Sequence, residues 1–83
     1  MRVLYFAWVK EKAGIAAEEI DPPAEVATIA ELIDWLKARG PEFENAFARS
    51  EVIRAAIDQS HVRHDARIEG AREIAFFPPV TGG

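Results

Sequence analysis

The sequence predicts an α+β roll, in which a mixed sheet of four to five strands packs against one main helix of about residues 29–39. Three observations lead to this fold class. A capped amphipathic helix stands near the middle of the chain, strand-like segments lie on both sides of it, and the most apolar of these segments are the first and the last. We therefore expect the first and last strands to be neighbours at the centre of the sheet.

The first predicted strand covers residues 3–9, where β-branched and aromatic residues follow one another. One of its faces would carry Val3, Tyr5, Ala7 and Val9, and the other would carry Leu4, Phe6 and Trp8. Both faces are apolar, so either both are buried within the protein or one of them is covered by a partner. Residues 10–14 then indicate a turn, and residues 17–20 a short second strand that ends before a pair of prolines.

The main helix has clear start and stop signals. Thr28 and Glu31 form a capping-box pattern at its beginning. The apolar stripe that follows at helical spacing consists of Ile29, Leu32, Ile33 and Leu36. Gly40 suits the position just after a helix, and Pro41 prevents its continuation. Residues 42–48 could add one more helical turn.

Three strands are predicted after the helix, over residues 52–57, 61–63 and 73–77. A turn at residues 58–60 joins the first two, and Ile68 in the next connection is expected to lie under the core. The residues expected in the core are Val3, Tyr5, Ile29, Leu32, Ile33, Leu36, Ile53, Ile57, Val62, Ile74 and Phe76.

Composition and charge exclude several classes of function. The net charge is −4, and the Lys and Arg residues are scattered, which argues against binding nucleic acid or an anionic membrane surface. There is no cysteine, so the chain has no disulfide or thiolate chemistry, a composition that suits a cytoplasmic protein. No apolar run approaches the length of a membrane-spanning helix, and the start of the chain is typical of a strand rather than a signal peptide.

Enzyme signatures are also absent from the sequence. It contains neither a glycine-rich phosphate loop nor a nucleophile motif. His61 and His64 would project to opposite sides of a strand, so we expect no metal site. The acidic pairs Glu18/Glu19 and Glu42/Glu44 are interpreted as solvated charge. We therefore expect no self-sufficient active site.

The chain ends in FFPPVTGG. Pro78 and Pro79 fix φ at two positions and favour a stiff, extended segment. Gly82 and Gly83 have no side chain, so they can enter a narrow channel in another protein. We expect residues 1–77 to form the domain, and residues 78–83 to form an extended, flexible tail that holds its terminal carboxylate away from the domain. The alternative is a frayed end without a function.

The segment EIAFFPPVTGG, at residues 73–83, resembles the C-terminus of the small subunits of molybdopterin synthase, which are sulfur carriers with the ubiquitin-like β-grasp fold. The opening VLYFAWVKEKAG is similar to the first strand and turn of that family, and the helix and the segment AAIDQSHV come in the expected order. The resemblance covers essentially the whole chain. Gly-Gly alone would fit any ubiquitin-like carrier, whereas FFPPV before it is more diagnostic.

The resemblance implies a function at the chain end. An activating enzyme would use ATP to adenylate the Gly83 carboxylate, and a sulfur donor protein would convert it to a thiocarboxylate. The tail, with Pro78, Pro79, Val80 and Thr81 leading to Gly82 and Gly83, would then enter the large subunit of the synthase. There the sulfur would pass to a cyclic pyranopterin precursor of molybdopterin, on the way to the molybdenum cofactor. The chain alone would catalyse nothing and would hold neither a cofactor nor a metal.

The same resemblance implies a heterotetramer of two large and two small subunits. The residues expected to contact the partner, on the sheet face opposite the helix, are Phe6, Phe77, His61, Leu4 and Trp8. Three alternatives stay open at this point. The chain could carry sulfur for thiazole formation or tRNA thiolation, it could be a ubiquitin-like protein modifier, or it could be an interaction module with an inert tail.

Overall fold

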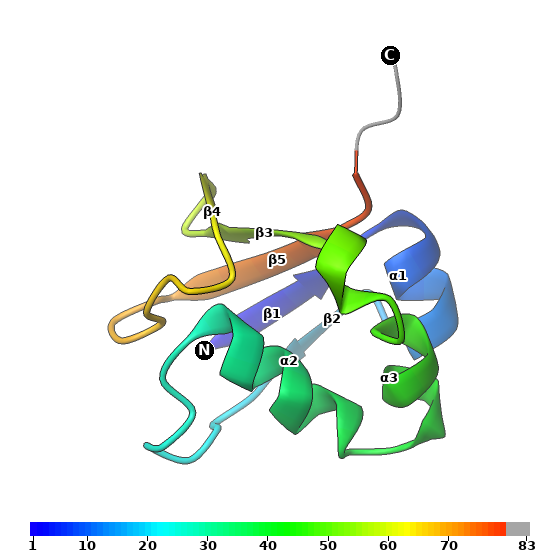
Figure 1. The fold of residues 1–83 in the computed structure, drawn as a ribbon, viewed down its shortest axis with the longest axis horizontal. Helices are drawn as coiled ribbons and strands as arrows, with labels where there is room; N and C mark the ends of the chain where they lie inside the picture. The colour runs from blue at the N-terminus through cyan, green and yellow to red at the C-terminus, as the bar shows by residue number, and fades with distance from the viewer. Residues whose placement is uncertain (80–83) are drawn as a thin grey trace.

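The computed structural model describes residues 1–79 and shows a five-stranded mixed sheet with helices against one of its faces (Figure 1). In chain order the elements are β1 (Arg2–Tyr5), α1 (Ala7–Ala13), β2 (Ala17–Glu19), α2 (Ile29–Lys37), α3 (Pro41–Ala46), the 3₁₀ turn η1 (Ser50–Val52), β3 (Arg54–Ile57), β4 (Ser60–Val62) and β5 (Glu73–Phe77). The strand order across the sheet is β2-β1-β5-β3-β4.

The first and last strands are neighbours at the sheet centre, as predicted. β1 and β5 run parallel, whereas the β1–β2, β3–β5 and β3–β4 pairs are antiparallel. Tyr5 lies opposite Phe76 and Val3 opposite Ile74, and all four side chains are buried under the helices. Because side chains alternate along a strand, the intervening residues of β1 and β5 point to the other face of the sheet.

The predicted strand over residues 3–9 is present only as far as Tyr5, and the prediction of strand and then turn over residues 6–14 is wrong. β1 ends at Tyr5, Ala7 adopts a left-handed backbone conformation with φ 53°, and α1 follows. Val9 and Ala13 lie one helical turn apart and are both buried in the core, which holds this short helix in place. Gly14 then ends α1 in the left-handed conformation that glycine adopts readily, and its N–H donates to the Lys10 carbonyl.

The capping box of α2 is confirmed. The Glu31 N–H donates to Thr28 Oγ1 at 3.2 Å, and the Thr28 N–H donates to Glu31 Oε1 at 3.1 Å. The end of this helix differs from the prediction, because Ala38 is its C-cap and Gly40 is instead the N-cap of α3. Pro41 therefore begins a helix, at the position where its missing N–H costs nothing.

The second half of the chain has the predicted strands with shifted ends. η1 ends at Val52, the first residue of the predicted strand, and β3 begins at Arg54. Asp58 and Gln59 form the turn between β3 and β4 with positive φ angles of 48° and 73°, the combination that matches the twist of a two-residue hairpin. β5 spans residues 73–77 as predicted, and Ile68 is buried.

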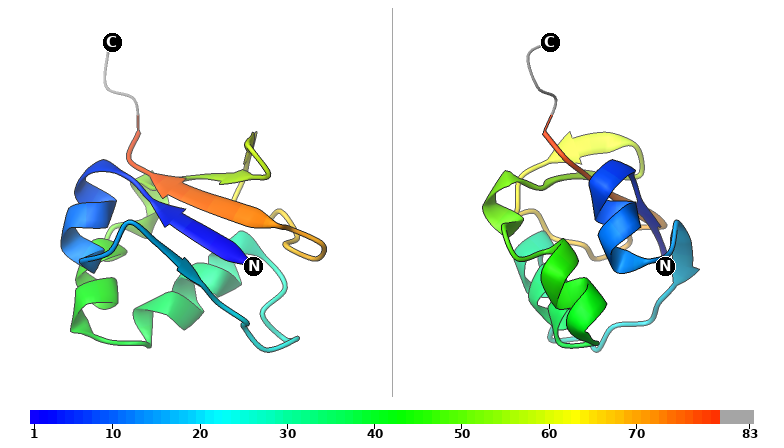
Figure 2. Two further views of the ribbon diagram at one scale, coloured as in Figure 1. Left: turned by 180° about the vertical axis from the view of Figure 1, so that it is seen from behind. Right: turned by 90° about the vertical axis from the view of Figure 1, so that its right-hand side faces the viewer.

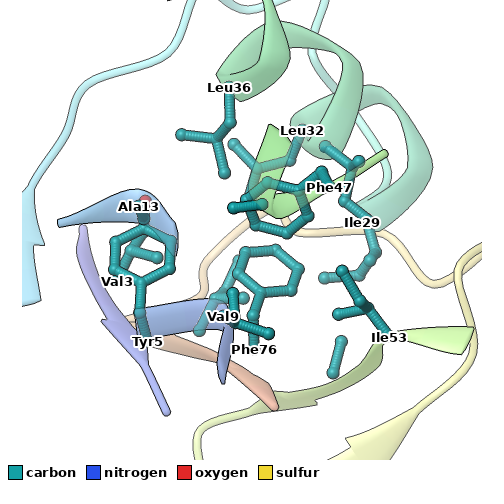
Figure 3. Close-up of a cluster of buried hydrophobic side chains, with 14 of the residues drawn as sticks. Val3, Tyr5, Val9, Ala13, Ile29, Leu32, Leu36, Phe47, Ile53 and Phe76 are labelled. Atoms are coloured by element: carbon teal, nitrogen blue, oxygen red, sulfur yellow. The ribbon is translucent and has the colours of Figure 1, made fainter. Parts of the chain in front are cut away.

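The core lies between the sheet and the helices, and its centre is aromatic (Figure 3). Phe47 packs edge-on against Phe76 with ring centroids 5.1 Å apart, and Tyr5 lies 6.3 Å from both. Of the predicted core residues only Ile57 and Val62 are half-buried, because both lie near the sheet edge formed by β4. Buried residues that were not predicted include Phe47, Ala46, Ala13 and Ile20.

Glu18 is part of a hydrogen-bonded cluster and is not the solvated charge that the sequence indicated. Its carboxylate accepts from the Tyr5 hydroxyl at 2.7 Å and from both terminal nitrogens of Arg39 at 2.7 and 2.9 Å. Arg39 also lies over the ring of Phe43, 4.8 Å from its centroid. The cluster therefore connects β1 and β2 to the helices on the core side of the sheet.

Candidate functional site

The candidate site begins where β5 ends. Phe77 is the last residue of β5, and the half-buried Pro78 and Pro79 follow it without regular secondary structure. The remaining predicted tail residues, Val80, Thr81, Gly82 and Gly83, lie outside the described residues. The extended tail therefore stays a prediction, while the strand that leads to it is defined.

The sheet topology decides where the chain leaves the domain. Because β1 and β5 are parallel, their C-terminal ends meet at the same edge of the sheet. Phe6 follows β1 at this edge, and its N–H donates to the Phe76 carbonyl at 3.1 Å. Figures 1 and 2 show the chain leaving the sheet at this edge, at the opposite end of β1 from the N-terminus. The segment after Phe77 thus starts beside Phe6.

The sheet face opposite the helices carries small and apolar side chains, and the charged Arg54 lies on the same face opposite Phe77. Strand register places Leu4, Ala75, Ala56 and His61 in one row across four strands. Phe77 continues this surface on β5, and its ring lies 5.2 Å from that of His61. Phe6 adds the most exposed large apolar side chain among the described residues, at 48% exposure. We call the surface formed by Leu4, Phe6, Ala56, His61, Ala75 and Phe77 the open face.

The structure brings together four of the five residues predicted to contact a partner. Phe6, Phe77, His61 and Leu4 belong to the open face. Trp8 does not, because β1 ends at Tyr5 and the chain then turns into α1. The half-buried Trp8 instead lies beside Lys12, whose Nζ is 5.0 Å from the centroid of its ring. The alternation that placed Trp8 next to Leu4 and Phe6 holds only within a strand, so its placement on the open face was wrong.

The two histidines occupy separate environments. His61 is exposed on β4, whereas His64 Nε2 lies 2.8 Å from the Ile53 carbonyl oxygen. Within residues 1–79, no group of three or more His, Asp or Glu side chains is arranged to hold a metal ion. Over the same residues, none of the helices has the length and apolar character needed to cross a lipid bilayer.

The electrostatics of the Glu18 cluster are structural rather than catalytic. Burial opposes ionisation of Glu18, but the hydrogen bonds from Arg39 and Tyr5 outweigh it and hold the pKa of that carboxyl below its usual value. Burial, followed by the hydrogen bond to Glu18, raises the pKa of the Tyr5 hydroxyl, which therefore stays protonated and donates. The bond to Glu18 likewise raises the pKa of Arg39. All three groups keep a fixed protonation state at neutral pH.

Comparison with known proteins places this geometry in a family. A sequence model described as the ThiS family matches residues 3–83. The chain belongs to the ThiS family. The match extends through Gly82 and Gly83, so this ThiS-family protein shares the chain end as well as the domain.

Two curated relatives of this ThiS-family protein are named molybdopterin synthase sulfur carrier subunits. The one from Escherichia coli is 35% identical over 83 residues, which is all of this chain and 99% of that protein. The one from Haemophilus influenzae is 31% identical over 83 residues, with the same coverage. Among solved structures, SAMP1 from Haloferax volcanii is 25% identical, has a TM-score of 0.75, and is covered to 98% by the whole of this chain. The predicted β-grasp roll is confirmed by this structural match.

Sequence reasoning missed α1 and, with it, the surroundings of Trp8. The signal was present, because Gly14 follows a segment with Lys10 and Lys12 at the positions of a last helical turn, where cations complement the helix dipole. The apolar run before it has the composition of a strand, so Val9 was assigned to strand alternation and Ala13 to the turn at residues 10–14.

Proposed function

We propose that this chain is the sulfur carrier subunit of a molybdopterin synthase and that it carries sulfur on the carboxyl group of Gly83. The observation that carries the proposal is full-length identity of 31–35% with sulfur carrier subunits of that synthase. The fold supports it, since the central strand β5 ends beside the exposed Phe6, and the last residues of the chain follow from there.

Activation of the chain end follows from carboxylate chemistry. A carboxylate is a poor electrophile at neutral pH, so an activating enzyme would join it to the AMP portion of ATP and release pyrophosphate. AMP is then a good leaving group. The outer sulfur of a persulfide on a sulfur donor protein would displace it to form an acyl disulfide, and a thiol would reduce that disulfide to leave a thiocarboxylate on Gly83. Glycine suits this step because, without a Cβ, it can pass through a narrow active-site channel. The need for ATP supports a cytoplasmic location.

Delivery of the sulfur would use the open face and the tail together. The large subunit of the synthase would cover the open face, because an exposed apolar side chain such as Phe6 favours burial by a partner. Pro78 and Pro79 would direct the following residues into its active site. Two transfers to a cyclic pyranopterin precursor would build the dithiolene of molybdopterin. In the heterotetramer, each small subunit would serve one large subunit.

Intact mass spectrometry tests the proposal most directly. The protein is incubated with ATP, the activating enzyme and a sulfur donor, and we expect a mass increase equal to the replacement of one oxygen by sulfur, located at Gly83 by fragmentation. A variant that lacks Gly83 should show no such change and should support no molybdopterin synthesis, yet it should remain folded. An activating enzyme that is competent on a known substrate and leaves this protein unchanged would refute the proposal.

The same experiment distinguishes the alternatives. Conjugates joined to lysine side chains through Gly83 would indicate a ubiquitin-like modifier, because an amine rather than sulfur would then have displaced AMP. A thiocarboxylate that forms but is used only by a thiazole-forming or tRNA-thiolating enzyme would keep the carrier chemistry and change the pathway.

A further inference from the structure

A second surface lies next to the open face, and the proposed function does not yet assign it a role. A cleft of about 470 Å³ lies between α1 and the segment from α3 to η1, and its lining includes Trp8, Lys12, Asn45, Arg49 and Val52. Trp8 and Val52 supply aromatic and apolar side chains to this lining, and Lys12 and Arg49 supply two cations. Trp8 and Lys12 stand one helical turn apart on α1, with the ammonium group over the indole ring.

The cleft is joined to the open face through the chain itself. Phe6, which belongs to the open face, is the N-cap of α1, and Trp8 follows two residues later. On the other side, η1 leads directly into β3, where Arg54 lies opposite Phe77. Figures 1 and 2 show α1 and η1 on either side of the place where the chain leaves β5. A protein large enough to cover the open face and receive the tail would also reach this cleft.

The charge of the cleft differs in sign from that of the whole chain. Two charged side chains line the cleft, Lys12 and Arg49, and both are cations, whereas the whole chain has a net charge of −4. The ion pair between Arg49 and Glu51 is long, at 4.0 Å, and both side chains are largely exposed. Such a pair holds the guanidinium weakly. Within the described residues, Lys12 has no carboxylate at ion-pair distance. Lys12 and Arg49 are therefore both available to bind an anionic group of a partner.

We propose that this cleft receives a carboxylate side chain of the large synthase subunit, an inference that rests on the proposed function. The carboxylate lies between Lys12 and Arg49, and the apolar part of its side chain packs on Trp8. A free small anion would bind such an exposed site weakly. A carboxylate carried by a protein already bound to the open face has a high effective concentration there.

The consequence is selective association. An acidic partner surface is repelled by the net negative charge of this chain and attracted by the two cations of the cleft. Complementary charges at a rim act mainly on the association rate and on orientation. The cleft therefore orients the large subunit so that the tail points toward its active site.

The experiment measures association of the full-length protein with the purified large subunit by stopped-flow. Lys12→Glu and Arg49→Glu should each lower the association rate constant roughly tenfold at low ionic strength, and added salt should diminish the difference. The matched controls are Lys37→Glu, which makes the same change in the last turn of α2, and Arg67→Glu in the loop before β5. Neither residue lines the cleft, and both variants should associate nearly as fast as the native protein. If a charge reversal impairs folding, Lys12→Gln and Arg49→Gln replace those variants and should lower the association rate constant by a smaller factor.

A second readout locates the contact. The chain contains two tryptophans, so 5-fluorotryptophan labelling gives two ¹⁹F resonances, which Trp35→Phe assigns. Unlabelled large subunit should shift the Trp8 resonance and leave that of Trp35 nearly unchanged. If the native protein binds and the charge variants bind equally fast, or if Trp8 does not respond, this inference is wrong and the proposed function stands. If the native protein does not bind the large subunit, the inference about the cleft and the proposed function are both wrong.

Discussion

At the scale of single residues, neighbouring side chains of similar character have different roles. Glu18 and Glu19 are adjacent, yet Glu18 accepts three hydrogen bonds from Tyr5 and Arg39, whereas Glu19 is 75% exposed and pairs only with the N-terminal ammonium. From the sequence alone, Glu18 and Glu19 cannot be told apart. Only the pairing of β2 with β1, which puts Glu18 on the core side beside Tyr5, separates them.

This difference predicts a pH-dependent stability. Glu18→Gln should lower the free energy of unfolding at neutral pH by about 1–2 kcal/mol, toward the lower part of the range for charge-assisted hydrogen bonds because Arg39 is partly exposed. The folded-state pKa of Glu18 is below its usual 4.5. Its contribution is therefore present above that usual value and is lost as the pH falls through the lower, folded-state pKa.

Urea unfolding at a series of pH values measures this effect. The difference between the native protein and Glu18→Gln should be constant near neutral pH and should shrink below about pH 4.5. Glu19→Gln is the control and should change the unfolding free energy by less than about 0.5 kcal/mol. A difference that persists unchanged in acid would show that the ionised carboxylate of Glu18 is not the source of the stability.

At the scale of elements, the sequence predicted best where local signals and tertiary packing agree. α2 has a cap and an apolar stripe, so its start was found, although it ends two residues before the predicted end, and β5 has alternating large residues and was found with its exact bounds. α1 was missed because seven residues are too few to show a helical period against a strand-like composition. Leu4, His61 and Phe77 were placed on the open face because they follow from strand alternation, whereas Trp8 was misplaced because it lies beyond the end of β1.

The capping box predicts a measurable share of the stability of α2. Thr28→Ala removes the acceptor of the Glu31 N–H and should cost about 1 kcal/mol, or roughly 4–8 °C in the melting temperature of a domain this small. Thermal unfolding followed by circular dichroism measures the change. Thr28→Ser keeps the hydroxyl and should remain close to the native protein. Equal melting temperatures for the alanine and serine variants would mean that the capping bond contributes nothing.

At the scale of the whole molecule, the sheet separates folding from recognition. One face is buried under the helices around an aromatic centre, and the other face carries the residues that we assign to the partner. β5 belongs to both, because it lies at the sheet centre and leads to the chain end. The point at which the chain leaves the sheet is thus set by the central strand β5.

Phe76 and Phe77 provide a direct test of this separation. Phe76 is fully buried against Phe47, so Phe76→Ala should cost about 3–5 kcal/mol, a large part of the roughly 4–12 kcal/mol expected for 83 residues. Phe77→Ala removes a half-buried ring from the open face and should cost less than half as much. Its main effect should be weaker binding to the large subunit, because a central aromatic contact is lost.

Urea unfolding measures the stability of each variant, and titration calorimetry measures its affinity for the large subunit. Ile15→Ala is the control, since Ile15 is also an exposed large apolar residue but lies outside the open face, in the loop between α1 and β2. It should leave binding unchanged. If Phe77→Ala reduces stability as much as Phe76→Ala and binds the large subunit with native affinity, then Phe77 is a core residue and the open face is not the partner surface. If Phe77→Ala stays folded and loses affinity while Ile15→Ala does not, the two faces of the sheet have the separate roles inferred for them.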